Sequence, residues 1–422
     1  MTEGAQRAGE RARALRALIA TLAIQIFTSL AATATSVLAP EIAPAFGIAS
    51  KWIGVFIGLV YLGAMMASLA CGGFIDRYGA IRVSQVSVLL CAAGAAIIAV
   101  APDRVVPVLV VAAVCVGLGY GAITPASSHV LIRTAPPEKL ALTFSIKQTG
   151  VPVGAALAGA LLPALAIIAG WRNAFLLIAG VGVVVAIASQ PTRRALDTDR
   201  RPDRRFSPAA IVKPLRLIRQ SRALTELALV SFVYAATQMC LTGFIVVYLN
   251  ESLGWSLVSA GFALTATTTL GGVAGRIVWG WIADRAWPPR RVLGIIGIVA
   301  GLCGGITATA GAAWPTVVLL AVFAAFGCTA IGWNGVQLAE VARHAPQGAA
   351  GAVTGASGFI TFAGVVAGPP IFALLSTVTG SYRAGFAVFA ALSALGGAAL
   401  LRSGSRRSDE KAANPAQGVD AK

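Results

Sequence analysis

The chain has 422 residues, of which 57% are hydrophobic and only 12% are charged. A soluble domain carries about 25% charged residues, so this composition excludes a soluble globular protein and indicates a chain surrounded by lipid. The net charge of +17 would suit a nucleic-acid-binding protein, but a basic groove requires a folded soluble face, so we expect no nucleic-acid partner.

Twelve apolar runs follow one another along the chain, and each approaches the ~20 residues that a helix needs to cross a bilayer. They are too long for barrel strands, which need only ~10 residues of alternating polarity. Helices also satisfy their backbone hydrogen bonds internally, as lipid requires. We therefore predict an all-α integral membrane protein with twelve transmembrane helices in two six-helix halves. The predicted spans are 15–39, 51–72, 81–101, 105–130, 141–166, 172–190, 223–249, 256–281, 291–311, 315–338, 351–376 and 384–401.

A long polar break after the sixth span sets the predicted domain boundaries. We expect an N-terminal half at 1–190, a basic cytoplasmic linker at 191–222, a C-terminal half at 223–402 and a disordered cytoplasmic tail at 403–422. The end of the linker fits an amphipathic helix at the lipid headgroups, and it fits a solvated linker without a specific partner equally well. The apolar face of such a helix would hold Ile211, Leu215 and Ile218.

The basic residues are distributed unevenly about the spans. Most of the 33 Lys and Arg residues lie at the termini or in the loops on one side. By the positive-inside rule, both termini are expected in the cytoplasm. The short loops and the many alanine, glycine and arginine residues suit a multi-pass protein of a bacterial inner (plasma) membrane. The basic residues in the opposite loops are Lys51, Arg104, Arg172 and Arg383.

One short pattern, Gly-x-x-x-Asp-Arg, occurs twice, after the second span and after the eighth. The two copies lie about half the chain apart. A loop repeated at this interval indicates a protein built from two copies of one unit, as many membrane transporters are. The residues of the pattern are Gly72, Asp76, Arg77 and Gly79 in the first copy and Gly280, Asp284 and Arg285 in the second.

Twelve spans, a basic central loop and this repeated pattern resemble the major facilitator superfamily of transporters over roughly residues 15–402. The resemblance implies that the loop latches the two halves together in the outward-facing state. It also implies that Asp76 meets span 11 and a basic residue of span 4, which would be Arg133. Gly72 would permit a close helix crossing, and Gly79 a left-handed turn. A tight turn that only orients the protein is the simpler alternative.

Two features differ from the proton–drug antiporters of that family. Those antiporters often carry an arginine within span 4. Span 4 of this chain has no basic residue other than His129 between Arg104 and Arg133. Span 5 reads Lys-Gln-Thr-Gly-Val-Pro-Val-Gly from Lys147 onward, in place of the antiporter pattern Gly-Pro-x-x-Gly-Gly. Both departures weaken the alternative function, which is a proton-coupled efflux pump for lipophilic or drug-like compounds.

Two basic residues lie inside the predicted spans, where an ionisable side chain is costly and usually functional. Lys147 lies about seven residues into span 5, roughly 10 Å deep at 1.5 Å per residue, and Arg276 lies at a similar depth in span 8. No Asp or Glu occupies the middle of a span to neutralise them. Two such cations predict an anionic substrate such as a small carboxylate. The alternative is that both side chains snorkel to the cytoplasmic surface.

Several uncharged polar residues are further candidates for substrate binding. The resemblance implies that spans 1, 4, 7 and 10 line the central cavity. An amide that faces lipid without a partner would cost several kcal/mol, so these side chains should point inward. Hydrogen bonds between packed helices would satisfy them equally well. The candidates are Gln25, Gln148, Tyr234, Gln238 and Asn334.

The coupling of transport is not visible in the sequence. His129 can carry a proton near neutral pH, although a simple hydrogen bond to a neighbour is its more common role. With no buried carboxylate, proton coupling, anion exchange and uniport all stay open. A transporter-like sensor or receptor is a less favoured alternative.

An enzyme is not expected, since neither paired carboxylates nor a nucleophile–histidine pair lies within the spans. The six cysteines show no metal-binding spacing, so we expect no metal site. No phosphate-binding loop for ATP occurs either, and we expect no cofactor. The resemblance implies a protein that is complete as a monomer.

Overall fold

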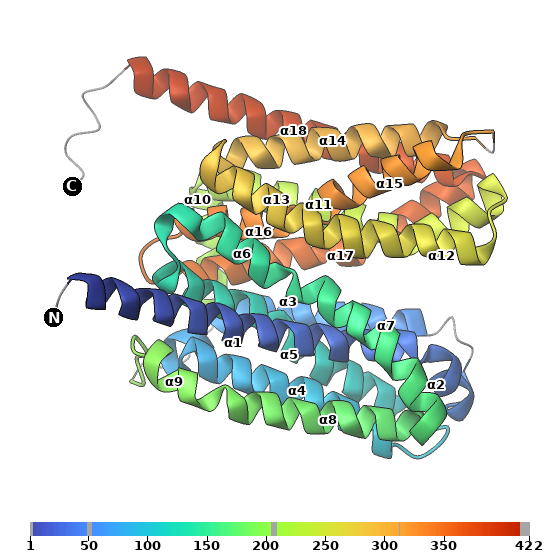
Figure 1. Cartoon of the computed structure of the whole chain (residues 1–422), viewed down its shortest axis with the longest axis horizontal. Coiled ribbons are helices and arrows are strands. Elements are labelled where there is room, and N and C mark those ends of the chain that lie inside the picture. Colours follow the sequence, from blue (N-terminus) through green and yellow to red (C-terminus); the bar gives the residue numbers. More distant parts are fainter. Residues whose placement is uncertain (1–2, 49–52, 204–208, 312, 414–422) are drawn as a thin grey trace.

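The computed structural model describes the chain except for residues 1–2, 49–52, 204–208, 312 and 414–422 (Figure 1). The described residues form helices and connecting turns, and they contain no strand. Lipid explains this result, because a helix satisfies its own backbone hydrogen bonds where the solvent offers no partner. The predicted all-α membrane fold is confirmed.

The N-terminal half forms six spans, the fifth of which is broken in two at Thr149. Pro152 has no N–H to donate to the carbonyl of Gln148, and this missing bond explains the break. The helices are α1 (Glu3–Val37), α2 (Ala39–Ala45), α3 (Ile53–Tyr78), α4 (Ala80–Val100), α5 (Pro107–Thr134), α6 (Leu140–Gln148), α7 (Gly150–Ala169) and α8 (Trp171–Ala188), with a 3₁₀ turn η2 (Pro137–Lys139) before α6.

The C-terminal half repeats this plan with more interruptions. Span 8 of the chain contains a π-helical segment, and span 10 is broken by a turn. The elements are α11 (Arg222–Val247), η3 (Tyr248–Ser252), α12 (Leu257–Thr265), η4 (Ala266–Gly271), α13 (Gly272–Arg285), α14 (Pro289–Thr309), α15 (Thr316–Ala330), α16 (Asn334–His344), α17 (Ala350–Thr379) and α18 (Tyr382–Ala413).

Eleven helices in the described part of the chain are long and apolar enough to cross a membrane. The remaining predicted span, 256–281, is helical from Leu257 to Arg285 as α12, η4 and α13. Helix α18 continues past the predicted boundary of the C-terminal half to Ala413. No proline interrupts this stretch, and residues 414–422 of the predicted tail lie outside the described residues.

The linker forms two short helices, α9 (Gln190–Leu196) and α10 (Ala209–Gln220). Helix α10 is the predicted amphipathic helix, and it contacts α3 and α17, one from each half. Ile218 on its apolar face is 3% exposed, and Leu215 packs against the same core. The apolar face of α10 therefore packs against the protein at Ile218 and Leu215.

The two halves lie beside each other, with the first half in blue to green and the second in yellow to red (Figure 1). Helices α3, α5 and α6 of the first half contact α13, α16 and α17 of the second. The start of α1, the end of α18 and the linker helices all lie at one end of the bundle. We call it the predicted cytoplasmic end, because the distribution of Lys and Arg assigns it to the cytoplasm.

The outer surface and the helix contacts both suit a bilayer. Ile167 and Ile168 near the end of α7 are 86% and 83% exposed, which lipid permits and water would penalise. Between helices, a Cβ atom at Gly121 of α5 would lie 2.1 Å from the carbonyl oxygen of Ala64 on α3. Small residues at such crossings are the usual means by which membrane helices approach closely.

Candidate functional site

Lys147 lies at the end of α6, beside the break in the fifth span, and is 1% exposed. Its Nζ atom donates hydrogen bonds to Oε1 of Gln25 on α1 at 2.6 Å and to Oε1 of Gln148 at 3.0 Å. A cation at the C-terminus of a helix is favoured by the helix dipole. The structure thus brings three of the predicted residues together, and the amine does not reach the surface of the protein.

Arg276 is the second buried basic residue, and it is also 1% exposed. Its Nη1 atom donates to the carbonyl of Gly272 in its own helix at 3.1 Å, and its Nε atom has no partner in the described part of the chain. The ion pairs found among the described residues join neither Arg276 nor Lys147 to a carboxylate. Two basic side chains are therefore buried without a counter-charge in that part of the protein.

The two basic residues come from facing helices of opposite halves. Asp284 of α13 contacts Ala141 of α6, and Gly280 packs against Ser145. Residue numbers fall along α13 as they rise along α6, so these two helices run antiparallel. One further turn of this register places Arg276 about level with Thr149, next to Lys147. The expectation that both residues lie at one depth agrees with this register.

Three of the candidates lie near an interruption of their helices. Lys147 precedes the break between α6 and α7, Arg276 follows the π-helical segment η4, and Asn334 begins α16 after the turn that ends α15. Interrupted helices near the middle of the membrane are typical of substrate sites in transporters, because they free backbone groups and dipole ends there.

The remaining predicted residues of the C-terminal half divide into two groups. Nδ2 of Asn334 donates to Oε1 of Gln238 at 3.2 Å, so this pair from α16 and α11 does meet, and both side chains are half-buried. Tyr234 is different, because its hydroxyl donates to the carbonyl of Leu293 on α14 at 2.9 Å. Its hydroxyl is thus used in packing between helices, and we no longer include Tyr234 in the candidate site.

The second copy of the repeated loop joins the two halves directly. Both carboxylate oxygens of Asp284 accept hydrogen bonds from the first turn of α6, from the N–H groups of Ala141 at 2.9 Å and Leu142 at 2.7 Å. Arg343 of α16 lies 3.4 Å from the same carboxylate. An aspartate that caps a helix start satisfies N–H groups that have no partner within the helix. The cap here comes from the opposite half.

Glycine makes the same contact possible. A Cβ atom at Gly280 would lie 2.5 Å from Oγ of Ser145, and one at Gly335 of α16 would lie 2.2 Å from it. Ser145 is completely buried between these two glycines. The N-terminal part of span 5 is therefore held between spans 8 and 10 of the other half, which closes the predicted cytoplasmic end at this point.

The first copy of the loop makes a related contact with span 11. A Cβ atom at Gly72 of α3 would lie 2.6 Å from Cβ of Ala352 on α17, so this crossing requires glycine, as expected. The basic residues of the two copies behave alike. The guanidinium of Arg77 lies over the ring of Tyr78, and that of Arg285 over the ring of Trp281. Neither of these stacking contacts crosses between the halves.

Arg133, the expected partner of Asp76, contacts an aspartate of the linker. Nη1 of Arg133 lies 2.5 Å from Oδ1 of Asp199, and Nε2 of His129 lies 2.6 Å from Oδ2 of the same residue. Burial opposes ionisation of Asp199, but the hydrogen bond from His129 and the charges of His129 and Arg133 outweigh it, so its pKa is lowered. Asp76 accepts a backbone hydrogen bond at its carbonyl from Arg201.

A second linker aspartate caps span 3. The carboxylate of Asp197 accepts hydrogen bonds from the N–H groups of Ile81 at 2.8 Å and Arg82 at 3.0 Å. Gly79 has a φ of +92°, and a Cβ atom there would lie 2.3 Å from Cγ of Asp197. The glycine thus supplies a backbone conformation with positive φ, although not the left-handed turn that we expected, and it leaves space for this carboxylate. Sequence reasoning missed both linker aspartates, and the only signal was their place in an otherwise arginine-rich segment.

Sequence reasoning also missed three aromatic residues at the boundary between the halves. Tyr61 of α3, Tyr120 of α5 and Phe362 of α17 are each within 6.4 Å of the other two, measured between ring centroids. We call these three residues the aromatic cluster. Aromatic side chains are also common on lipid-facing surfaces, so their presence in spans gave no distinguishing signal.

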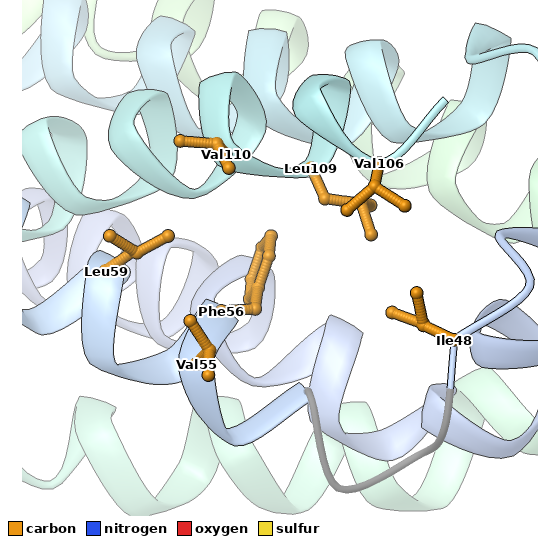
Figure 2. Close-up of a pocket in the computed structure, with 7 residues that line it drawn as sticks. All are labelled: Ile48, Val55, Phe56, Leu59, Val106, Leu109 and Val110. Atoms are coloured by element: carbon orange, nitrogen blue, oxygen red, sulfur yellow. The ribbon is translucent and has the colours of Figure 1, made fainter. Parts of the chain in front are cut away.

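The apolar pocket in Figure 2 does not resemble a site for a charged ligand. It has a volume of about 240 Å³ and lies between the first turns of α3 and α5, away from the predicted cytoplasmic end. Its described lining contains no polar or charged side chain to hold an anion in place. The lining residues are Ile48, Val55, Phe56, Leu59, Val106, Leu109 and Val110.

This fold and site define a membrane transporter with two halves around a central polar site. A family model described as Major Facilitator Superfamily matches residues 21–369 and 227–421. The chain therefore belongs to the Major Facilitator Superfamily, and it is a multi-pass membrane transporter and not an enzyme.

Two relatives and one solved structure illustrate the likeness. The chain is 26% identical over 384 residues to a gentisate transporter of Corynebacterium glutamicum, a match that covers 88% of this chain and 83% of that one. It is 21% identical over 389 residues to a hexuronate transporter of Bacillus subtilis, covering 88% and 90%. The crystal structure of the human organic anion transporter MFSD10 superposes with a TM-score of 0.76 at 16% identity, covering 92% and 99%, which supports the fold alone.

Proposed function

We propose that this protein is a secondary transporter that moves a small organic carboxylate across a bacterial inner membrane by alternating access. The observation that carries the proposal is the guanidinium of Arg276, which is buried and whose Nε has no partner among the described residues. A buried charge without a partner is strongly destabilising. A carboxylate would supply two acceptor oxygens in the geometry that a guanidinium binds best.

Lys147 adds a second basic group from the opposite half. Its two hydrogen-bond acceptors, Gln25 and Gln148, are neutral amides, so they orient the amine without neutralising it. An anion bound between Lys147 and Arg276 would contact both halves of the protein. Such a ligand would couple its own binding to the relative position of the halves, which is what alternating access requires.

The contacts at the predicted cytoplasmic end support a closed state on that side. Release of a substrate there would require α6 to leave α13 and α16, and this movement would break the cap that Asp284 makes on α6. His129 is engaged by Asp199 of the linker, so we assign it to closure of this end. The names of two relatives, a gentisate transporter and a hexuronate transporter, also support the proposal, because gentisate and hexuronate are both carboxylates.

Equilibrium binding to the purified protein tests the proposal. Isothermal titration calorimetry would compare aliphatic and aromatic carboxylates with their neutral amides. We expect binding of at least one carboxylate, no binding of its amide, and loss of binding in Arg276→Gln. The control is Arg216→Gln, because Arg216 is an exposed residue of α10. Equal binding of an acid and its amide, or unchanged binding in Arg276→Gln, would contradict the proposal.

A further inference from the structure

A cleft lies between the start of α1 and the linker helix α9, at the predicted cytoplasmic end (Figure 1). It has a volume of about 410 Å³, and we call it the α1–α9 cleft. Helix α1 contributes Arg13 and Arg16 to its lining, and α9 contributes Pro191, Thr192 and Leu196. None of the candidate substrate residues lines it, so the cleft is separate from the site of the proposed function.

The charge of the α1–α9 cleft is positive. Its described lining contains two arginines and no acidic residue, and Glu10 of α1 is not part of it. Nη2 of Arg13 donates a hydrogen bond to the carbonyl of Ala195 on α9 at 3.1 Å, which leaves the other donors of this guanidinium unused. The side chain of Arg16 is exposed and has no hydrogen-bond or ion-pair partner among the described residues. Two guanidinium groups one helical turn apart can thus bind a phosphate, whose oxygens match their geometry.

The cleft lies where the exposed surface changes from apolar to basic. Ile19 of α1 is 57% exposed, and Ile187 of α8, one turn before Pro191, is 67% exposed. Exposed isoleucines indicate the hydrocarbon layer, because water would penalise them. Arg16 and Arg13 lie about 4.5 Å and 9 Å beyond Ile19 along the helix, at 1.5 Å per residue. The headgroup layer on each side of a bilayer is roughly 5–8 Å thick. Arg16 therefore lies within that layer, and Arg13 lies at its outer edge.

We infer that the α1–α9 cleft binds the headgroup of an anionic phospholipid, with its phosphate on Arg13 and Arg16 and its acyl chains along Ile19 and Ile187. Basic pockets between helices on the cytoplasmic side of a membrane bind such headgroups. Inorganic phosphate could use the arginines, but it would leave the apolar side of the cleft uncovered. The combination of two charges with adjacent exposed isoleucines therefore favours a lipid.

A bound lipid would also affect the linker. It would contact α1 and α9 together and so hold the first part of the linker against the first span. A ligand that binds only the folded protein stabilises it. Binding of the lipid should therefore raise the melting temperature. This inference goes beyond the proposed function and does not depend on it, because no substrate takes part.

A pair of phospholipids with the same acyl chains tests the inference. Phosphatidylglycerol carries a net negative charge, whereas phosphatidylcholine carries none. Binding of each lipid to the detergent-solubilised full chain can be measured by native mass spectrometry, with the melting temperature as a second measurement. We expect phosphatidylglycerol to bind more tightly and to raise the melting temperature more than phosphatidylcholine does.

Variants show whether this preference comes from the cleft. Arg16→Gln should weaken phosphatidylglycerol binding roughly five-fold, and Arg13→Gln/Arg16→Gln roughly 25-fold, from the contribution of one basic residue near an anionic lipid surface. The matched control is Arg216→Gln/Arg219→Gln, which removes two exposed arginines of the same spacing from α10 and should leave the affinity unchanged. The melting temperature without lipid shows whether each variant is folded.

The possible outcomes either support the inference or overturn it. Equal binding of the two lipids, or equal weakening in the cleft variants and the α10 control, would show that the cleft does not recognise an anionic lipid. If inorganic phosphate alone raises the melting temperature as much as phosphatidylglycerol does, the cleft is a site for a soluble anion and the lipid inference is wrong. Carboxylate binding bears only on the proposed function, so the two can fail separately.

Discussion

The amine of Lys147 donates a hydrogen bond of 2.6 Å to the side-chain amide of Gln25. The bond joins span 5 to span 1 within the N-terminal half, and both residues are 1% exposed. The bond thus connects a basic residue of the candidate site to a helix that is expected to line the central cavity. Replacing one partner of the bond should therefore affect stability and function differently from replacing the other.

Gln25→Leu should destabilise the protein, whereas Lys147→Met should mainly remove function. The first change leaves a buried amine with Gln148 as its single remaining acceptor, at a cost of about 1–3 kcal/mol. The second removes the buried amine itself and leaves two neutral amides. We expect a lower melting temperature for Gln25→Leu, and a near-normal melting temperature with lost carboxylate binding for Lys147→Met. The reverse order of stability would contradict this view of the pair.

Removal of the Asp284 carboxylate should open the predicted cytoplasmic end. Asp284→Ala takes away the cap on α6, worth about 0.5–2 kcal/mol, from a contact that exists only when the halves are closed. Maleimide labelling of Ser145→Cys should then become faster, because Ser145 is completely buried in the closed contact. Asp284→Asn keeps one acceptor oxygen and should fall between wild type and Asp284→Ala. Equal labelling in all three proteins would show that Asp284 does not hold this end closed.

Gly280→Ala should also open the predicted cytoplasmic end, here by steric repulsion alone. The added methyl group would lie 2.5 Å from Oγ of Ser145 and 3.0 Å from the carbonyl of Ala141, so α13 and α6 must separate. Gly305→Ala is the matched control, because a Cβ atom there meets nothing within 4 Å. The expected result is faster labelling of Ser145→Cys with Gly280→Ala only. A similar change with Gly305→Ala would point to a general effect of alanine.

The linker contact at Asp199 should depend on pH in the acid range. The folded-state pKa of Asp199 is lowered from its ordinary value of 3.8, so the ionised carboxylate stabilises the fold. This contribution is complete well above pH 4 and is lost as the pH falls through the folded pKa. Asp199→Asn should therefore lower the melting temperature at pH 7, and the difference from wild type should shrink as the pH falls below 4. A difference that grows on acidification would contradict the assignment.

The fold was largely predictable because lipid imposes the same rule on every span. The twelve apolar runs, the linker and the duplicated loop all follow from hydropathy and spacing, and the structure departs mainly at interruptions such as Thr149 and at the end of α18. The candidate site was predictable only in part. A buried charge such as Lys147 or Arg276 is visible in a sequence because it is rare within a span, as intramembrane charges generally are.

The partners of those residues were not predictable, because they depend on tertiary contacts. The sequence of the linker is rich in arginine, which is typical of a solvated segment. In the structure, however, Asp197 caps a helix and Asp199 binds two side chains of span 4. We expected Tyr234 in the cavity because it shares a helix face with Gln238. The sequence does not reveal which neighbouring helix that face contacts, and the Tyr234 hydroxyl binds α14 instead. The second copy of the loop is degenerate in sequence, yet its Asp284 carboxylate contacts the opposite half directly.

Transport by purified protein in proteoliposomes tests the central claim most directly. Uptake of labelled benzoate and an aliphatic carboxylate would be measured with and without an inward proton gradient, in wild type, Arg276→Ala, Lys147→Ala and the control Arg216→Ala. We predict saturable uptake of a carboxylate that is lost in Arg276→Ala, reduced in Lys147→Ala and retained in the control. If no carboxylate is taken up, or if both site variants transport normally, the buried basic residues do not recognise an anionic substrate.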